Sequence, residues 1–412
     1  MPDKAPSLDV TREGLAAIGF LGSPLFRRIQ DNPLACVVIT GTNGKGSTAA
    51  TLEALCLSAG ERTGLYTSPH LEKINERVRI DGIDVDDSVF LAAFNYVWSR
   101  TQHLKLSHFE WLTLIAIEIL SSGRFAKPVE RLILEVGLGG TWDCTNAVPH
   151  GMAVIASLAL DHENLLGRTL HEIAENKFGI VSNGCLVVHT PFPAEAQAIM
   201  EQVRTRTQSR WIEAVPARSY CATKGRDPVP FIEILWGVAE LNLAGERGAI
   251  NTALALTVFA QLGYDPGSHL KALKKVRWPG RMEKLSHPDC LAPIYLSGDH
   301  NPAGIQSLLQ MLPSYPREHL HILVGIGKDK DCQGMLAPLS KIKNSSLYLT
   351  ETSFRGRTLE EYGDWLDRAR GAWKVPTQAL TQIMGQAQPY DMVLVTGSLY
   401  LVGDLRRELV SS

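Results

Sequence analysis

The sequence lacks any strong excess of charge of one sign and any long apolar run. Its 412 residues hold 41 Lys and Arg against 43 Asp and Glu, a formal charge of −2. A balance of this kind gives no electrostatic reason to expect a nucleic acid or an anionic membrane as partner. The longest apolar runs, such as residues 152–160, fall far short of the ~20 residues that a membrane span needs.

Paired cysteines are missing too. The seven cysteines are scattered and form no Cys-x-x-Cys pair, so we expect reduced thiols and neither a disulfide framework nor a zinc site. The first residues show no basic segment followed by an apolar one, as a signal peptide would. What is present is ordinary for globular proteins, with 45% hydrophobic and 20% charged residues. We therefore expect a soluble, cytoplasmic enzyme or nucleotide-binding protein.

The first half of the chain alternates short β-branched runs with longer stretches of helical periodicity. Such alternation predicts an α/β fold with a mostly parallel sheet that is covered on both faces. The predicted strands are 36–40, 131–136, 152–157 and 186–189, and the predicted helices are 48–60, 109–120 and 170–180.

The pattern changes after residue 218 and restarts near residue 283. Residues 219–237 alternate polar and apolar side chains, which suits antiparallel strands at an edge of the sheet, and residues 251–262 read as a helix. Residues 277–283 contain a Pro-Gly pair typical of a linker. Strand patterns return at 293–296, 319–324, 346–350 and 392–395. We predict one domain over 1–282 and a smaller one over 283–412.

A glycine-rich loop lies between the first predicted strand and the helix that follows it. Backbone N–H groups of such a loop can surround phosphate oxygens at a helix N-terminus, and a lysine adds a positive charge. The strict P-loop pattern is not met, because a glycine follows the lysine. The alternative is a glycine-rich turn with a surface lysine. The candidate phosphate-binding residues are Gly41, Thr42, Asn43, Gly44, Lys45, Gly46 and Ser47.

Together with this loop, five further segments resemble the Mur ligase superfamily and most closely its folate branch, the dihydrofolate synthase/folylpolyglutamate synthase family. They occur in the family's order, at 67–80, 134–146, 160–180, 300–304 and 397–403. The resemblance implies a P-loop domain with a mostly parallel sheet, a smaller Rossmann-like C-terminal domain, and an ATP- and Mg²⁺-dependent ligase of folate metabolism.

The resemblance also implies a magnesium site. Its ligands would be Ser47, Ser68, Glu135, His162 and Lys177, the last as a carbamate formed with CO₂. A positive lysine would repel the metal, whereas a carbamate attracts it. The alternatives are a salt-bridged or capping Glu135, a structural His162 and a solvated Lys177.

Further residues match family positions at the nucleotide and at the reacting groups. The resemblance implies that Asn251 lies near the adenine and that Arg281 reaches the ATP phosphates, although Arg281 could also be a solvated hinge charge. Lys45, Lys177 and His300 would be the catalytic groups. The family aspartate at a ribose hydroxyl is replaced by Ser297, and Asp299 follows two residues later as a possible substitute.

The pterin-binding positions of the family match Ser107, Phe109 and Asp143, although Phe109 is equally a candidate core residue. Near them, Trp142 and Cys144 replace the usual Leu and Ala. An aromatic ring such as that of Phe109 can stack on a flat heterocycle.

The predicted activity is addition of L-glutamate to dihydropteroate and to reduced folates through an acyl phosphate. The partners would be these small molecules alone, with no nucleic acid or membrane, and the chain would be a monomer. The alternatives are an enzyme with one of the two activities, a peptidoglycan Mur ligase, and a nucleotide-binding regulator without ligase activity.

Overall fold

The computed structural model describes residues 7–224 and 227–411, which divide into two compact units. The first unit runs to Ala217 and includes Glu233–Ala239 and Ile250–Val276. The second contains Arg218–Ile232, Glu240–Ala249 and the chain from Arg277 onward. The chain thus passes finally from the first unit to the second after residue 276, and two short earlier segments also belong to the second unit. The domain boundary near residue 282 stays a prediction.

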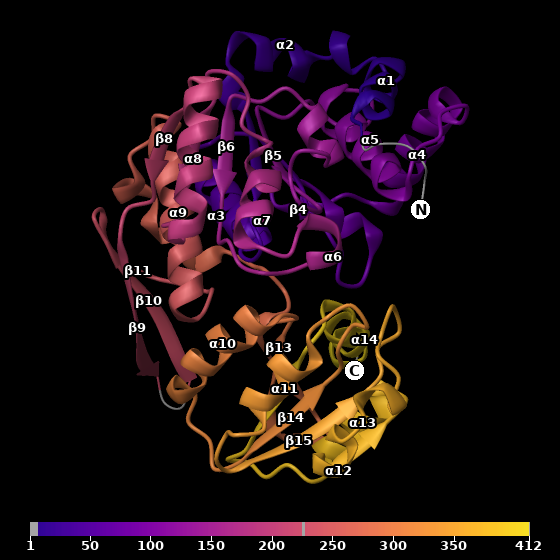
Figure 1. Ribbon diagram of the computed structural model, residues 1–412, viewed down its shortest axis with the longest axis vertical. Coiled ribbons are helices and arrows are strands. Elements are labelled where there is room, and N and C mark those ends of the chain that lie inside the picture. The colour runs from indigo at the N-terminus through magenta and orange to yellow at the C-terminus, as the bar shows by residue number, and fades with distance from the viewer. Residues whose placement is uncertain (1–6, 225–226, 412) are drawn as a thin grey trace. The chain divides into compact units, whose positions relative to one another are not determined.

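The first unit is built on a sheet in the order β4-β3-β2-β5-β1-β6-β7-β8 (Figure 1). In this sheet β2, β5, β1, β6, β7 and β8 pair in parallel. The strands β3 and β4 add an antiparallel edge next to β2. This arrangement confirms the predicted α/β class. The bounds are β1 Cys36–Thr40, β2 Thr63–Tyr66, β3 Val78–Ile80, β4 Ile83–Asp84, β5 Arg131–Glu135, β6 Met152–Ile155, β7 Leu186–His189 and β8 Arg210–Glu213.

Helices flank this sheet, and none of the described helices of the chain is both long enough and apolar enough to cross a membrane. The predicted helices 48–60, 109–120, 170–180 and 251–262 correspond to α3, α5, α7 and α9. The bounds are α1 Asp9–Ala17, α2 Pro24–Asp31, α3 Lys45–Ser58, α4 Asp87–Thr101, α5 His108–Ser121, α6 Glu163–Leu166, α7 Leu170–Phe178, α8 Ala194–Thr207 and α9 Gly245–Gln261.

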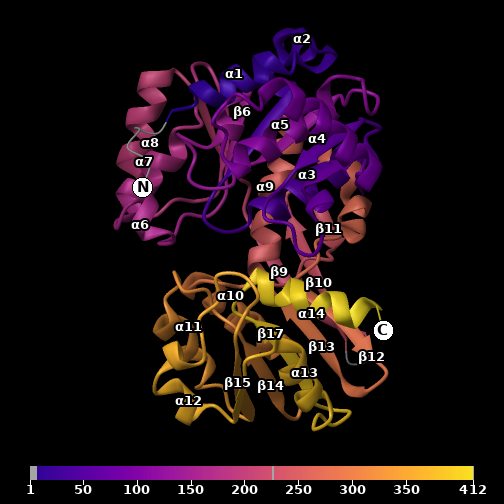
Figure 2. The same ribbon diagram turned by 90° about the vertical axis from the view of Figure 1, so that its right-hand side faces the viewer.

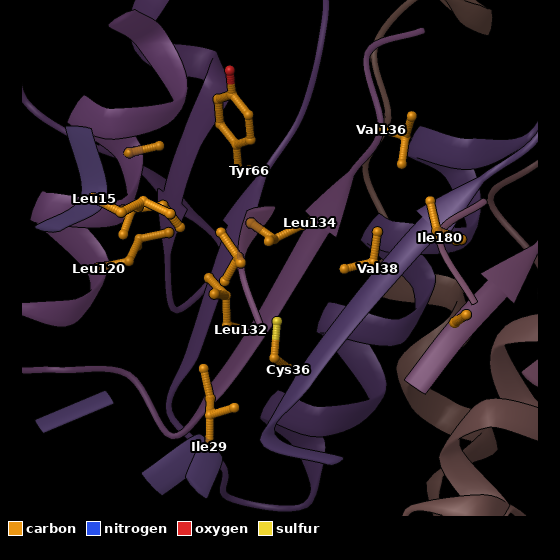
Figure 3. Packing of buried hydrophobic residues seen from close by; sticks show 14 of the residues in the cluster. Leu15, Ile29, Cys36, Val38, Tyr66, Leu120, Leu132, Leu134, Val136 and Ile180 are labelled. Carbon is orange, nitrogen blue, oxygen red and sulfur yellow. The ribbon is translucent and has the colours of Figure 1, made fainter. Parts of the chain in front are cut away.

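Burial on both faces explains why the central strands are apolar throughout. In β1, Cys36 and Val38 join the core formed with α1, α2, α5, α7 and α8, and the whole strand is buried. Alternate residues of a strand point to opposite faces, and α3 packs on strands β1, β2 and β5. Figure 3 shows the first face, with Leu132 and Leu134 of β5 near Cys36 and with Tyr66 above them.

The second unit has a sheet in the order β12-β13-β17-β14-β15-β16, in which only the described pair β12–β13 is antiparallel (Figure 2). Its core includes Ile322, Val324 and Leu394. The bounds are β12 Arg281–His287, β13 Cys290–Ser297, β14 Leu320–Val324, β15 Ser345–Thr350, β16 Gly371–Trp373, β17 Met392–Thr396, α10 Pro302–Met311, α11 Cys332–Leu339, α12 Trp365–Arg368, α13 Pro376–Met384 and α14 Leu399–Ser411.

Two expectations are corrected. The strands predicted within 219–237 do not extend the large sheet; β9 Ala217–Lys224, β10 Asp227–Ile234 and β11 Gly237–Glu240 form a separate three-stranded sheet. The predicted linker 277–283 ends early, because Arg281 already opens β12, opposite Ser297 of β13. The Pro-Gly pair marks a tight turn before a strand, a use that the sequence pattern shares with linkers.

Candidate functional site

The glycine-rich loop connects β1 to α3 and depends on two glycines in unusual backbone conformations. Gly44 has φ +90° and lies directly before the first turn of α3, a conformation that residues with a Cβ rarely adopt. A Cβ on Gly44 would overlap Asn251 Oδ1, and one on Gly41 would lie 2.8 Å from the Ala156 Cβ. The backbone therefore approaches its neighbours closely, as a loop that cradles phosphate requires.

The loop is tied to the segment after β6. The Thr42 N–H donates to the Ser157 carbonyl at 2.7 Å, and the Thr42 hydroxyl donates to the Ala159 carbonyl at 3.0 Å. The Ser157 hydroxyl donates to the Asn43 carbonyl at 3.0 Å. These bonds hold the loop in shape at the carboxyl ends of β1 and β6, the edge where ligands bind in α/β sheets.

Two lysine side chains converge on one carbonyl oxygen of this loop. Lys45 Nζ lies 3.0 Å from the Gly41 carbonyl oxygen, and Lys177 Nζ, from α7, also lies 3.0 Å from it. Lys177 is only 3% exposed. Burial, and after it the positive charge of Lys45, lower the pKa of Lys177 to about 7. Two like charges beside a glycine-rich loop form a place where an anion is stabilised.

Glu135 supplies a carboxylate at the same edge of the sheet. It ends β5, which pairs with β1, and it is buried. Its Oε2 accepts the Ser68 N–H at 3.1 Å, so two of the predicted metal-binding residues are neighbours. A buried carboxylate beside a phosphate-binding loop matches the way in which proteins bind Mg²⁺, by one or two carboxylates together with phosphate oxygens.

The remaining predicted metal ligands lie on the same side of the fold. Ser47 is in the first turn of α3 and is buried, and His162 precedes α6 with φ +52°. The described residues hold no cluster of three His, Cys, Asp or Glu side chains arranged to bind a metal. The donors present fit Mg²⁺ when they are combined with phosphate oxygens, and a carbamate on Lys177 would add a second anionic group.

The predicted pterin-binding residues have clear structural roles. The Ser107 hydroxyl caps α5 by accepting the Glu110 N–H, and the half-buried Phe109 ring packs beside Gly137 and Tyr66. The Asp143 carboxylate accepts the Leu138 N–H and the Thr145 N–H and hydroxyl, and burial raises its pKa. Asp143 thereby holds together the loop that follows Glu135.

In the second unit, hydrogen bonds at the end of β13 join the buried Ser297 and Asp299 to Arg247, whose side chain is 26% exposed. The Ser297 hydroxyl donates to Asp299 Oδ2 at 2.7 Å, and Arg247 Nη1 donates to Asp299 Oδ1 at 3.1 Å. Arg247 Nη2 also donates to the Ala303 carbonyl at 2.6 Å. Because the Ser297 hydroxyl already donates its hydrogen to Asp299, its oxygen can only accept a hydrogen bond from a further partner.

Arg281 and His300 meet at the backbone of Gly298. Arg281 Nη1 donates to the Gly298 carbonyl at 3.1 Å, and His300 Nδ1 lies 3.0 Å from the same oxygen. Because a carbonyl can only accept, His300 carries a proton on Nδ1. The structure thus brings both predicted residues together at the carboxyl end of β13.

Sequence reasoning missed Arg247 and Ser157. Arg247 stands in the first turn of α9, and only its distance to Asp299 gives it a role. Ser157 follows β6 and is bonded to a loop that lies 114 residues earlier in the chain. An isolated Arg or Ser in such positions carries no local signal, so neither residue could have been found from the sequence.

Comparison with known proteins identifies the class first. Residues 280–399 match the family described as Mur ligase, glutamate ligase domain. The structure of E. coli FolC in complex with DHPP and ADP superimposes with a TM-score of 0.82 at 26% identity, covering 99% of this chain and 94% of that one. The bifunctional folylpolyglutamate synthase/dihydrofolate synthase of Yersinia pestis, complexed with AMPPNP and Mn, gives 0.82 at 27% identity, covering 99% and 95%.

The sequence relatives narrow the class to one family. The dihydrofolate synthase/folylpolyglutamate synthase of Haemophilus influenzae is 30% identical over 401 residues, which cover 89% of this chain and 87% of the relative. The chain belongs to the dihydrofolate synthase/folylpolyglutamate synthase family, whose members are ATP-dependent ligases.

Proposed function

We propose that this chain adds L-glutamate to dihydropteroate and to reduced folates with hydrolysis of ATP to ADP and phosphate. A carboxylate oxygen of the pteroate or folate attacks the γ-phosphorus, and the bond from that phosphorus to the β,γ-bridging oxygen breaks, giving an acyl phosphate and ADP. The glutamate amine then attacks the acyl carbon, phosphate leaves, and the amine gives up a proton. The names of the Haemophilus and Yersinia relatives support both activities.

One observation carries this proposal: Lys45 and Lys177 both lie 3.0 Å from the Gly41 carbonyl oxygen, in a loop that precedes a helix. Bringing a carboxylate to a triphosphate requires neutralisation of several negative charges. In the proposed reaction Lys45 holds the terminal phosphates, and the backbone of the loop orients them. The bonds from Ser157 keep this backbone in place as charge moves.

Glu135, Ser68, Ser47 and His162 are the residues that we propose to hold Mg²⁺, which supplies charge neutralisation to the phosphate oxygens. The hydrogen bond from the Ser68 N–H to Glu135 supports this proposal, because it keeps the carboxylate beside Ser68. The complexes of the Yersinia relative with Mn and AMPPNP and of the E. coli relative with ADP support a nucleotide and a divalent metal for this chain.

We further propose that Lys177 is carbamylated. The neutral form of its Nζ attacks the carbon of CO₂ and loses a proton, so that the lysine side chain becomes an anion beside the proposed metal. The proximity of Lys177 to Lys45 supports this change, since it removes a repulsion between like charges. Nuclear magnetic resonance with ¹³C-labelled CO₂ tests it. The carbamate signal should vanish in Lys177→Ala and persist in Lys127→Ala, which changes an exposed lysine of the same unit.

The residues of the second unit that were predicted to act on the nucleotide stay predictions. For Ser297 we propose an acceptor role toward a ribose hydroxyl, supported by the donation of its own proton to Asp299. In that case Ser297→Ala should raise the KM for ATP several-fold. Light scattering tests the predicted monomer.

Phosphate release from ATP tests the activity itself. We expect release only when L-glutamate is present with dihydropteroate or with tetrahydrofolate. Release with one of these acids alone would support the single-activity alternative, and release with a UDP-muramyl peptide would support a Mur ligase. If no phosphate is released with any of these acids, the result would support the nucleotide-binding regulator without ligase activity.

A further inference from the structure

The second unit has a pocket at the opposite edge of its sheet from Ser297. Strand β17 begins at Met392, and Asp391 before it lies at the amino ends of the parallel strands. The pocket has a volume of about 170 Å³, and a dry cavity of about 150 Å³ is known to hold benzene. It therefore has room for one compact ring. Its lining includes Pro293, Tyr295, Tyr315, Pro316, Asp391 and Met392.

The apolar walls of the pocket favour an aromatic ring. The rings of Tyr295 and Tyr315 meet edge to face, with centroids 5.1 Å apart, and both residues are buried. Aromatic rings prefer edge-to-face or offset neighbours, so a third ring can extend this packing. Prolines and packed rings also lose little conformational freedom when a ligand binds.

A buried carboxylate gives the pocket a hydrogen-bond acceptor. Asp391 is 8% exposed, and its Oδ2 accepts from His321 Nε2 at 3.2 Å and from the Gln388 N–H at 2.8 Å. Within the described part of the chain, Oδ1 accepts no hydrogen bond, and it is not one of the fully enclosed polar atoms that lack a partner. Oδ1 is therefore open to the pocket and can accept from a ligand.

A buried chain of hydrogen bonds fixes the orientation of this carboxylate. His321 Nδ1 lies 3.2 Å from the Tyr348 hydroxyl. Since a carboxylate can only accept, His321 donates its Nε2 proton to Asp391 and accepts the Tyr348 proton at Nδ1. Burial lowers the pKa of His321, which favours this neutral form. The proposed ligase reaction uses none of these three residues.

Tyr315 gives the same pocket a hydrogen-bond donor. The residue is 6% exposed, and among the described residues its hydroxyl has no hydrogen-bond partner and is not fully enclosed. Burial raises the pKa of Tyr315, so the hydroxyl keeps its proton. The Tyr315 carbonyl accepts from Arg317 Nη1 at 2.8 Å, which holds the backbone that carries the ring.

Together these two groups select a hydroxyl on the ligand. A carboxylate oxygen can only accept, whereas the protonated tyrosine can donate. A ligand hydroxyl both donates and accepts, so one such group between Asp391 and Tyr315 bonds to both. An ammonium group would leave the Tyr315 proton without an acceptor, and an ether would leave Asp391 Oδ1 without a donor.

We propose that this pocket binds a compact, neutral aromatic molecule that carries a hydroxyl group. The ring packs among the tyrosine and proline side chains, the hydroxyl donates to Asp391 Oδ1, and its oxygen accepts from the Tyr315 hydroxyl. Lys284 also lines the pocket, but it is exposed and has interactions of its own. We assign it no role in binding, and a neutral ligand requires no charge from it.

Ligand-observed nuclear magnetic resonance titrations of the full chain without ATP test the proposal with three matched probes. The probes are phenol, anisole, which accepts but cannot donate, and toluene, which does neither. We expect phenol to bind about tenfold more tightly than anisole, since a hydrogen bond to a charged group is worth about that factor. Anisole should bind about fivefold more tightly than toluene, since a neutral hydrogen bond is worth less.

Two variants assign the two hydrogen bonds. Tyr315→Phe removes only a hydroxyl that has no partner among the described residues, so the fold should be kept. It should weaken phenol and anisole about fivefold each and leave toluene unchanged. Asp391→Asn should reduce the advantage of phenol over anisole, because a neutral amide accepts more weakly than a carboxylate. Tyr315→Phe serves alone if Asp391→Asn does not fold.

The controls separate this pocket from other places where phenol could bind. Tyr400→Phe changes an exposed tyrosine of the same unit outside the pocket, and Lys45→Met changes the proposed ligase site. Both should bind the three probes as the parent does. The proposal is overturned if phenol does not bind, if anisole binds as tightly, or if Tyr315→Phe leaves the affinity for phenol unchanged. Tighter binding of benzylamine than of phenol would also overturn it, because the pocket would then select a cation.

Discussion

The two units handle buried charge in opposite ways at the carboxyl edges of their sheets. In the first unit two cations, Lys45 and Lys177, converge on the Gly41 carbonyl oxygen at 3.0 Å each. In the second unit the buried carboxylate of Asp299 is matched by Arg247, 3.1 Å away, and by the Ser297 hydroxyl. Like charges are brought together in one case and opposite charges in the other.

The difference indicates which edge is built around a charged ligand. Burying like charges together is unfavourable, and a protein keeps such an arrangement where a ligand of opposite charge repays the cost. A buried ion pair, in contrast, is internally balanced and needs no ligand. We therefore expect substitution of Lys45 to change mainly activity, and substitution of Arg247 to change mainly stability.

The largest expected effect tests the first half of this comparison. Lys45→Met removes a charge that we place on the terminal phosphates, and we expect kcat to fall about 10³-fold, as for the loss of a strong electrostatic contact in other enzymes. The thermal unfolding midpoint should change little. Lys127→Met, at an exposed lysine of the same unit, should leave kcat unchanged. An equal loss in both variants would contradict the role of Lys45.

The second prediction concerns the balanced pair. Arg247→Met leaves Asp299 buried without its cation, which should cost about 3 kcal/mol of stability and lower the thermal unfolding midpoint. Arg204→Met breaks the exposed pair with Glu201, whose side chains are 55% and 56% exposed, and should cost less than about 0.5 kcal/mol. If the two variants unfold at the same temperature, the carboxyl edge of the second unit is not held by this pair.

A third prediction separates backbone conformation from contact in the glycine-rich loop. Gly44 and Gly60, near the two ends of α3, have φ +90° and +85°. A Cβ would overlap Asn251 at Gly44 and would meet nothing within 4 Å at Gly60. Both alanine variants should lose about 1 kcal/mol of stability, but only Gly44→Ala should raise the KM for ATP, by about tenfold. A KM that rises equally in both would show that the close contact is irrelevant.

Much of the fold could be predicted because it depends on local patterns. The strand 36–40 matches β1 in every residue, since five consecutive β-branched or apolar residues before a glycine are typical of a buried parallel strand. The helix after the loop begins at Lys45 instead of residue 48, because Gly44 in its left-handed conformation allows the loop residues to enter the first turn. The separate sheet of β9, β10 and β11 was missed because an alternating pattern predicts antiparallel strands but does not show whether they join a larger sheet.

In the candidate site, too, features that follow local sequence patterns could be predicted, and contacts between residues distant in the sequence could not. The loop and Glu135 follow strands directly, so their shared edge could be inferred from the order of the strands. The contact of Lys177 with Gly41 joins residues 136 positions apart and could not be predicted; the resemblance to a family indicated only that Lys177 belongs to the site. The commitment of the Asp299 carboxylate to Arg247 could not be read from the sequence, because the two residues are 52 positions apart with no pattern between them.

A last prediction concerns a buried carboxylate that lies away from the carboxyl edges of both sheets. Glu53 of α3 is buried, its Oε1 has no hydrogen-bond partner within the described residues, and Arg79 lies 3.9 Å away. Burial raises the pKa of Glu53 to about 7.

Between pH 4.5 and 7 the unfolded chain loses the proton of Glu53 while the folded chain keeps it, so the stability of the folded chain falls as the pH rises. The stability of Glu53→Gln relative to the parent should therefore rise with pH, by about 3 kcal/mol at pH 8, with little gain at pH 4.5. Thermal unfolding at both pH values measures this. A gain that is the same at both pH values would mean that Glu53 is already ionised in the folded chain, and that Arg79 balances it as Arg247 balances Asp299.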